Sequence, residues 1–203
     1  NSAYPIAEKF AAFKWNTIEI DGHDFDAIKK AVDDTKNEVM QYNNKLFIPY
    51  FHIISTGYTR ASDIGYLSSV DCMEDRNDDN YISVVKYTDS EALDRLGNTW
   101  PDIRMDAEDA GVFQIIERDD SGYVTEIMAG RITTDGETFA SCMGLKSSSF
   151  TVNISSGNVI FTVKGDGAGY GMSLCNARTK ASAGAVYKEI LNYYYKNITI
   201  TNV

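Results

Sequence analysis

A histidine followed by small hydroxyl residues is the first feature of the sequence that could support chemistry. His52 lies at the end of a predicted strand, and Ser55 and Thr56 follow it closely. An imidazole beside hydroxyl groups at a strand end is typical of a site for a polar ligand. Asp63 or Asp71 could supply the acid of a Ser-His-Asp set, although the spacing defines no geometry for one. The alternative is a buried histidine with a structural hydrogen bond.

A glycine-rich stretch over residues 165–171 is the second such feature. It reads Gly-Asp-Gly-Ala-Gly-Tyr-Gly, between a predicted strand and a predicted helix. Its spacing matches neither GxGxxG nor GxxxxGK(S/T), which argues against nucleotide binding. Alternating glycines permit close approach of the backbone to a ligand or to another segment of the chain. A tight strand-to-helix crossover is the alternative interpretation.

The composition excludes several classes of partner and cofactor. The 203 residues carry a formal charge of −10, so duplex nucleic acid and anionic membranes are poor partners. Cys72, Cys142 and Cys175 show no CxxC spacing, and we expect buried or half-buried thiols. With His23 and His52 as the two histidines, we expect no metal and no cofactor. No run approaches the roughly 20 apolar residues of a membrane-spanning helix.

The N-terminal part of the chain is expected to place two helices before a hairpin. Apolar residues recur at helical spacing in residues 4–16 and again in residues 25–35. Strands are predicted over residues 38–42 and 46–51, joined across Asn43-Asn44. The reason is that an asparagine pair between two apolar runs favours a two-residue hairpin turn.

The rest of the chain alternates between strand and helix patterns. The predicted elements are a solvated loop over 74–80, a strand over 82–87, a helix beginning at Ser90, a hairpin of 113–117 and 123–128, a strand over 158–164, and two helices separated by Gly184. No linker or internal repeat divides the chain. We therefore predict one α+β domain over residues 1–203, with mixed β-sheet and hairpins, short helices and the glycine-rich strand-to-helix turn near the C-terminus.

The two stretches that could support chemistry together resemble a known family, that of stage II sporulation protein D and the amidase enhancers. The family's C-terminal signature runs G-x-G-H-G-V-G-M-S-Q-x-G-A, followed by a helix and Y-x-E-I-L-x-x-Y-Y. Here the first part is GDGAGYGMSLCNA at Gly165–Ala177, and the second is YKEILNYY at Tyr187–Tyr194. Both parts align without a gap.

Upstream segments are similar to further family motifs, in the same order. Residues 51–59, FHIISTGYT, resemble F-H-S-T-S-G-G-Y-T, and residues 31–45 resemble A-V-x-x-T-x-G-x-V-L-x-Y-N-G-K. Residues 66–70 and 144–150 also fit the family order. The resemblance spans about residues 25–200, and several motifs in order are more specific than any one of them.

The resemblance implies a lytic transglycosylase that cleaves peptidoglycan glycan strands in sporulation or cell-wall remodelling. In such an enzyme one acid protonates the glycosidic oxygen and then acts as base while the sugar's own hydroxyl closes an anhydro ring. Glu8, in the first predicted helix, is the candidate for that catalytic glutamate. The residues implied for glycan binding are His52, Ser55, Gly57, Tyr58, Gly167, Gly169, Tyr170 and Ser173.

Departures from the family pattern support an alternative function. The family histidine of the glycine-rich stretch is Ala168 here, and the family glutamine is Leu174. Both changes remove hydrogen-bonding groups from positions expected to face glycan. The alternative is therefore a catalytically degenerate module that binds glycan or activates an amidase. A third interpretation is that the chain lacks part of the family's N-terminal catalytic helix region.

The resemblance also implies where the protein works and with what. The expected partners are peptidoglycan glycan strands, together with a cell-wall amidase or another sporulation wall-remodelling protein, and no nucleic acid. We expect an extracytoplasmic protein of the cell envelope, membrane-anchored or secreted. Because the chain begins at Asn1 rather than Met, we expect that a signal or anchor is not present in this sequence.

Overall fold

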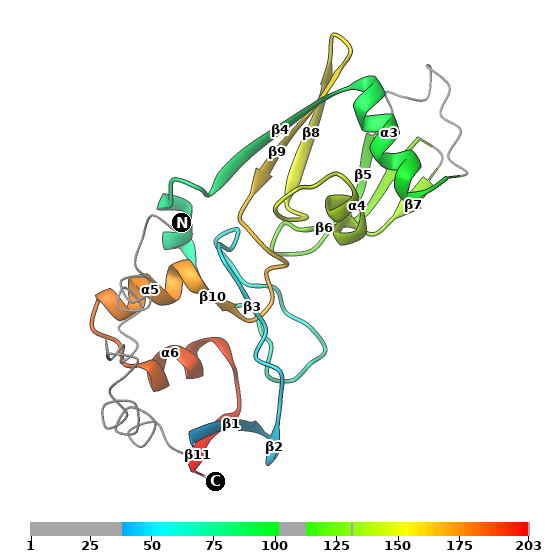
Figure 1. Ribbon diagram of the computed structural model, residues 1–203. Coiled ribbons are helices and arrows are strands. Elements are labelled where there is room, and N and C mark those ends of the chain that lie inside the picture. The colour runs from blue at the N-terminus through cyan, green and yellow to red at the C-terminus, as the bar shows by residue number, and fades with distance from the viewer. Residues whose placement is uncertain (1–37, 102–112, 131, 203) are drawn as a thin grey trace, which may run out of the picture.

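A computed structural model describes residues 38–101, 113–130 and 132–202 (Figure 1). Short helices and several small, mostly antiparallel sheets make up this part of the chain. The predicted α+β class is confirmed. The helices predicted over residues 4–16 and 25–35, and with them Glu8, lie outside the described residues. None of the described helices is long and apolar enough to cross a membrane.

The first sheet is built around the predicted asparagine hairpin. Strand β1 (Glu38–Tyr42) pairs antiparallel with β2 (Lys45–Leu46) and, on its other edge, with β11 (Ile198–Asn202) near the C-terminus. Asn43 and Asn44 have φ of 52° and 59°, the left-handed conformation that a two-residue hairpin turn of this type requires. The hairpin was therefore predicted correctly.

The second predicted strand, residues 46–51, is wrong in its extent. Pairing with β1 stops at Leu46, and the chain reaches Pro49, which has no backbone N–H for a ladder bond. Residues Phe51–His52 then form a separate strand, β3, which pairs in parallel with β10 (Met172–Ser173). This short parallel pair brings together the two motif stretches, which are more than a hundred residues apart.

One end of the molecule is formed by two sheets and two helices (Figure 1). Their bounds are β4 (Ile82–Thr88), β9 (Asn158–Lys164) and β8 (Phe150–Ser155), in the order β4-β9-β8; β5 (Phe113–Arg118), β6 (Val124–Ala129) and β7 (Ile132–Thr134), in the order β5-β6-β7; and α3 (Asp89–Thr99) and α4 (Gly136–Cys142). A core of buried aromatic and branched side chains joins them. The strands expected at 82–87 and 158–164 and the hairpin of 113–128 are confirmed.

Helix α3 begins at Asp89, one residue before the predicted start at Ser90. Thr88 is the N-cap: its side chain accepts a hydrogen bond from the Glu91 backbone N–H at 3.2 Å, and the Thr88 N–H donates to the Glu91 carboxylate at 2.8 Å. This reciprocal pair is a capping box, which satisfies two backbone donors at once. With Ser90 as the N-cap neither backbone donor would be satisfied in this way, because the Glu91 carboxylate that completes the box lies three residues after Thr88.

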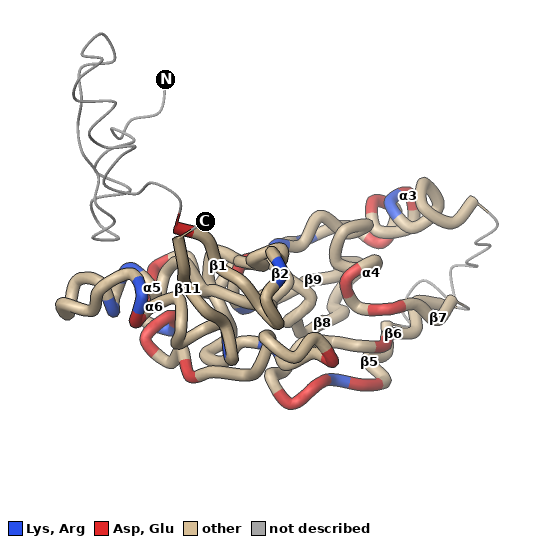
Figure 2. Tube along the Cα trace, turned by 90° about the horizontal axis from the view of Figure 1, so that it is seen from below, with Lys and Arg blue, Asp and Glu red and all other residues tan. Residues whose placement is uncertain are grey.

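The other end of the molecule holds α5 (Leu174–Ser182) and α6 (Tyr187–Tyr194), packed with the β11-β1-β2 sheet around a second core. Figures 1 and 2 both show β1 and β11 with α5 and α6 at the end away from α3 and α4. Gly184 separates the two helices as predicted. Tyr194 and Tyr195 are buried in the second core, where their rings contribute to packing.

The solvated loop predicted over residues 74–80 is correct in that most of these residues are exposed, but wrong in conformation and in the burial of Asp75. Residues Met73–Asn77 form a 3-10 helix, η1, which packs against α5. The side chain of Asp75 is fully buried, although it stands in a run of charged residues that is typical of a surface loop. A buried carboxylate requires hydrogen-bond donors, and these donors come from the two motif stretches.

Candidate functional site

The glycine-rich stretch folds tightly against the backbone of residues 50–54. Ile53 and Ile54 donate backbone hydrogen bonds to the Asp166 carbonyl, and Met172 donates to Tyr50. Gly167 has φ of +110°, and a Cβ there would lie 2.7 Å from the His52 Cβ. A Cβ on Gly171 would overlap the Tyr50 carbonyl oxygen. The alternating glycines thus allow close approach to another segment of this chain, the strand that carries His52.

His52 is buried, with 3% of its surface exposed. Its Nδ1 lies 3.1 Å from the Tyr170 carbonyl oxygen, and its Nε2 is buried without a hydrogen-bond partner among the described residues. Burial lowers the pKa of the imidazole, because a charged ring loses hydration that the bond to Tyr170 replaces only in part. His52 therefore ties the glycine-rich stretch to β3, which is the structural alternative considered from the sequence.

Asp75 connects the two motif stretches through a single carboxylate oxygen. Its Oδ2 accepts hydrogen bonds from the Ser55 backbone N–H at 2.8 Å and from the Ser173 hydroxyl at 2.6 Å. Both serines are fully buried. Ser173 is also the N-cap of α5, since its oxygen accepts from the Asn176 N–H. The carboxylate thus links the middle of the first motif, at Ser55, to the start of α5 at Ser173.

The same contacts decide the question of a Ser-His-Asp set. The acid that meets a serine is Asp75, and neither Asp63 nor Asp71 takes that position. Ser173 donates directly to the carboxylate, while His52 bonds to a backbone carbonyl, so no imidazole stands between serine and acid. A Ser-His-Asp set requires that intervening base. In the described part of the chain, this cluster is an anchor for the two stretches.

Arg60 is a site residue that the sequence reasoning missed. Its guanidinium donates to Asp119 at 2.6 Å, to Glu137, and to the Ala168 carbonyl at 3.3 Å. The rings of Tyr123 and Tyr170 lie on it with centroids 4.9 Å and 4.5 Å away. Arg60 thus contacts the backbone at Ala168, the position of the family histidine, and holds the glycine-rich stretch to the turn after β5 and to α4 by charge and stacking.

A cleft of about 420 Å³ opens beside this junction. It is lined by Thr56 and Tyr58 from the histidine stretch, and by Arg76, Tyr81, Arg118, Asp120, Ser121, Gly122, Ser149, Phe150, Thr151, Thr162 and Lys164. Most of these residues carry a hydroxyl, guanidinium or ammonium group. Tyr58 is 42% exposed, so its ring is available to a ligand. Such a set can bind a hydroxyl-rich molecule by hydrogen bonds and by stacking on the tyrosine.

The structure sorts the eight predicted binding residues into two groups. The first group lies at the junction of the motif stretches, where its members hold the two stretches together: His52, Ser55, Gly167, Gly169, Tyr170 and Ser173. Gly57 has φ of +113° and lies under the guanidinium of Arg76, next to Tyr58 at the cleft. Their role toward glycan stays a prediction, and Tyr58 is the member of the set that lines the cleft.

Signals for the missed residues were present but ambiguous. Arg60 directly follows the histidine motif, and Asp75 lies in a charged run that resembles a solvated surface. Each acquires its role through partners far away in the sequence, which local patterns do not reveal. Within the described ranges, no group of three or more His, Cys, Asp or Glu side chains is arranged to hold a metal ion.

Comparison with known proteins gives the chain its relatives. No protein-family model matches it. The chain is nevertheless a distant homologue of stage II sporulation protein D and of the amidase enhancer, as the motifs predicted.

Three of the similar proteins are from Bacillus. The chain is 28% identical over 180 residues to "Stage II sporulation protein D" of Bacillus amyloliquefaciens and to that of Bacillus subtilis, with 86% of this chain covered. It is 24% identical to the "Amidase enhancer" of Bacillus subtilis, with 95% of this chain covered. The chain spans about half the length of the two sporulation proteins, 51%, and 34% of the amidase enhancer.

Proposed function

We propose that this protein acts on the bacterial cell wall, binding peptidoglycan glycan strands and cleaving them as a lytic transglycosylase in sporulation or wall remodelling. The observation that carries the proposal is distant homology to stage II sporulation protein D over 86% of the chain. The protein would work outside the cytoplasm, at the cell envelope, where that polymer lies.

The cleft supports the binding part of the proposal. A glycan strand presents hydroxyl groups at its edges and apolar C–H surfaces on its sugar faces. Hydroxyls of Thr151 and Thr162 and the half-exposed ring of Tyr58 match those two kinds of surface. In this proposal the buried junction of His52, Asp75 and Ser173 positions the cleft wall, and Tyr58 contacts the sugar.

The chemical step is assigned to Glu8. Its carboxylic acid donates a proton to the glycosidic oxygen as the bond from that oxygen to the anomeric carbon breaks. The resulting carboxylate then removes a proton from a hydroxyl of the same sugar, whose oxygen bonds to the anomeric carbon and closes the anhydro ring. No water is consumed. The step requires an acid that holds its proton near neutral pH, as a carboxyl group in a dry pocket does.

Mass spectrometry of glycan products tests this function directly. We expect the full chain to release anhydro-sugar fragments from purified glycan strands, and the Glu8→Gln variant to release none, because the amide can neither donate nor accept the proton. Glu189→Gln, a substitution of an exposed carboxylate on α6, should retain full activity. Fragments that carry a water-derived hydroxyl instead of the anhydro ring would rule out this chemistry.

A second candidate function is a non-catalytic module that binds glycan or activates a wall amidase. It is favoured by the likeness to the amidase enhancer, which covers 95% of this chain. Ala168 and Leu174, which replace the family's hydrogen-bonding residues, point the same way. If neither the chain nor Glu8→Gln forms products while both sediment with cell walls, this second function holds.

A further inference from the structure

Three cationic side chains line one cleft of an acidic protein. The chain carries a formal charge of −10, yet Arg76, Arg118 and Lys164 face the same space, with Asp120 as the one acid in its lining. They come from η1, from the end of β5 and from the end of β9. Because like charges repel, such a cluster is unfavourable unless something negative offsets it.

Carboxylates do not offset these charges among the residues that the structure describes. Four other cations there do form ion pairs: Arg60 with Asp119 and Glu137, Lys146 with Asp166, Arg178 with Asp78, and Lys188 with Glu38. No described carboxylate pairs in this way with the three cations of the cleft. The lining of the cleft therefore carries three cations against one acid, a balance that favours an anionic ligand.

The two guanidinium groups are held in place by backbone carbonyls. Arg76 donates from Nε to the Thr56 carbonyl at 3.1 Å, and the Tyr81 hydroxyl donates to that same oxygen. Arg118 donates to the carbonyls of Gly122 and Phe150 at 2.9 Å and 2.6 Å. These neutral acceptors fix each planar group while leaving its charge and further N–H donors available, the arrangement that favours oxyanion binding.

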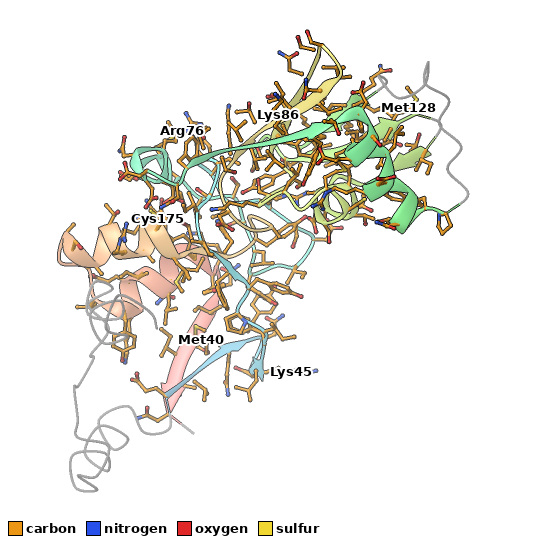
Figure 3. The ribbon with its side chains drawn as sticks, turned by 45° about the horizontal axis from the view of Figure 1, so that its top comes forward. Met40, Lys45, Arg76, Lys86, Met128 and Cys175 are labelled. Atoms are coloured by element: carbon orange, nitrogen blue, oxygen red, sulfur yellow. The ribbon has the colours of Figure 1, made fainter. Side chains whose placement is uncertain are left out.

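The outer face of the β4-β9-β8 sheet adjoins the cleft and adds one further cation, Lys86, among apolar and hydroxyl side chains. Strand alternation turns Val85, Tyr87, Phe161 and Val163 toward the core. The residues on the opposite face are Ile82, Val84, Lys86, Thr151, Asn153, Ile160, Thr162 and Lys164, which include two lysines and no acid. Figure 3 shows Arg76 and Lys86 on η1 and β4, far from Lys45 at the other end of the molecule.

We propose that the cleft is an oxyanion site, and that its ligand is a linear, hydroxyl-rich polymer carrying repeated negative charges. Arg76, Arg118 and Lys164 bind one oxyanion group, and the adjoining sheet face, with Lys86, accommodates the next part of the chain. Carboxylate and phosphodiester groups share this chemistry. The proposal deepens the proposed function, since it makes charge as well as sugar shape a determinant of binding in the same cleft.

Binding of soluble probes at low and high salt tests the oxyanion site. We expect poly(glycerol phosphate) or polygalacturonate to bind the full chain at 20 mM salt and to bind at least about tenfold more weakly at 300 mM, because salt screens the contacts. If poly(glycerol phosphate) binds more tightly, the ligand is a phosphodiester polymer. If polygalacturonate binds more tightly, the ligand is a carboxylate polymer. A neutral N-acetylglucosamine hexamer should show no salt dependence.

Variants link this effect to the cleft. Lys164→Gln and Arg76→Gln should each weaken polyanion binding by about threefold to tenfold, and Arg76→Lys should restore part of the loss. Lys45→Gln, which removes one charge at the far end of the molecule, is the matched control and should have no effect.

Either of two results would overturn the oxyanion site. In the first, polyanions bind no more tightly than the hexamer. In the second, Lys164→Gln and Lys45→Gln weaken polyanion binding to the same extent. Hexamer and cell-wall binding would survive that result, so the proposed function would stand. Salt-dependent, Lys164-dependent binding of polyanions with no retention on cell walls would instead support the oxyanion site and reject peptidoglycan as the target.

Discussion

At the scale of single residues, the site depends on polar side chains that contact each other rather than solvent. Asp75, Ser55 and Ser173 are all fully buried, and one carboxylate oxygen serves both serines. The network continues from Asn176, which accepts from the Tyr194 hydroxyl at 2.7 Å and donates to Glu74 at 3.0 Å. A buried network of this kind specifies one arrangement, because each misplaced group would lose its partner without access to water.

Replacing Asp75 by alanine should destabilise the protein strongly. The substitution leaves the Ser55 N–H and the Ser173 hydroxyl buried without an acceptor, and each such group costs about 1–3 kcal/mol. Asp75→Asn keeps one acceptor oxygen and should cost less. The free energy of unfolding, from urea titration, measures both. Asp79→Ala, on an exposed neighbour, should change it by less than about 0.5 kcal/mol. Equal effects at both positions would contradict the role of Asp75.

At the scale of elements, the strand β3 and the glycine-rich stretch form one unit. Their backbones lie too close for side chains at Gly165, Gly167 and Gly171, each of which has a positive φ. The unit has no long strand or helix of its own. Its geometry comes from backbone contact, from Arg60 and from Asp75, which explains why glycine at these positions is a requirement of packing.

Two glycine-to-alanine substitutions should therefore have opposite effects. Gly171 has φ of +73°, and a methyl group there would overlap the Tyr50 carbonyl oxygen. Gly171→Ala should lower the free energy of unfolding by more than the roughly 1–2 kcal/mol that a left-handed conformation costs alone. Gly97 lies in α3 with nothing within 4 Å, so Gly97→Ala should raise it by about 0.5–1 kcal/mol.

Urea midpoints of the two variants and the native chain provide the comparison. Because Gly97 lies in α3, away from the glycine-rich stretch, it is a control for the chemical change itself. A Gly171→Ala variant as stable as the native chain would mean that the contact between β3 and this stretch is looser than described.

At the scale of the whole molecule, two hydrophobic cores are joined by the motif stretches. In Figure 1, β3 and β10 lie between the sheets that bear α3 and α4 and the helices α5 and α6. Acidic positions gather around α4 and β5 in Figure 2. The cleft with its cations lies where residues of β5, β8, β9 and η1 meet Tyr58. A site at such a junction can change its ligand contacts while the cores keep their packing.

The sequence predicted elements whose signals are local. The strand at 82–87 alternates cleanly, the asparagine pair specifies its turn, and Gly184 separates two helices. It did not predict η1, the pairing of β3 with β10, or the role of Arg60, because each depends on partners distant in the sequence. The run around Asp75 shows the limit most clearly, since its residue types are those of a solvated loop and only tertiary contacts bury it.

Sedimentation with purified peptidoglycan tests the central claim, that this chain binds the cell wall through the cleft, most directly. The full chain should pellet with peptidoglycan. Tyr58→Ala should weaken binding by about threefold to tenfold, as expected for the loss of one stacking contact. Tyr187→Ala removes a ring of similar exposure, 44% against 42%, outside the cleft, and should bind like the native chain. No retention of the native chain, or equal losses in both variants, would contradict the account.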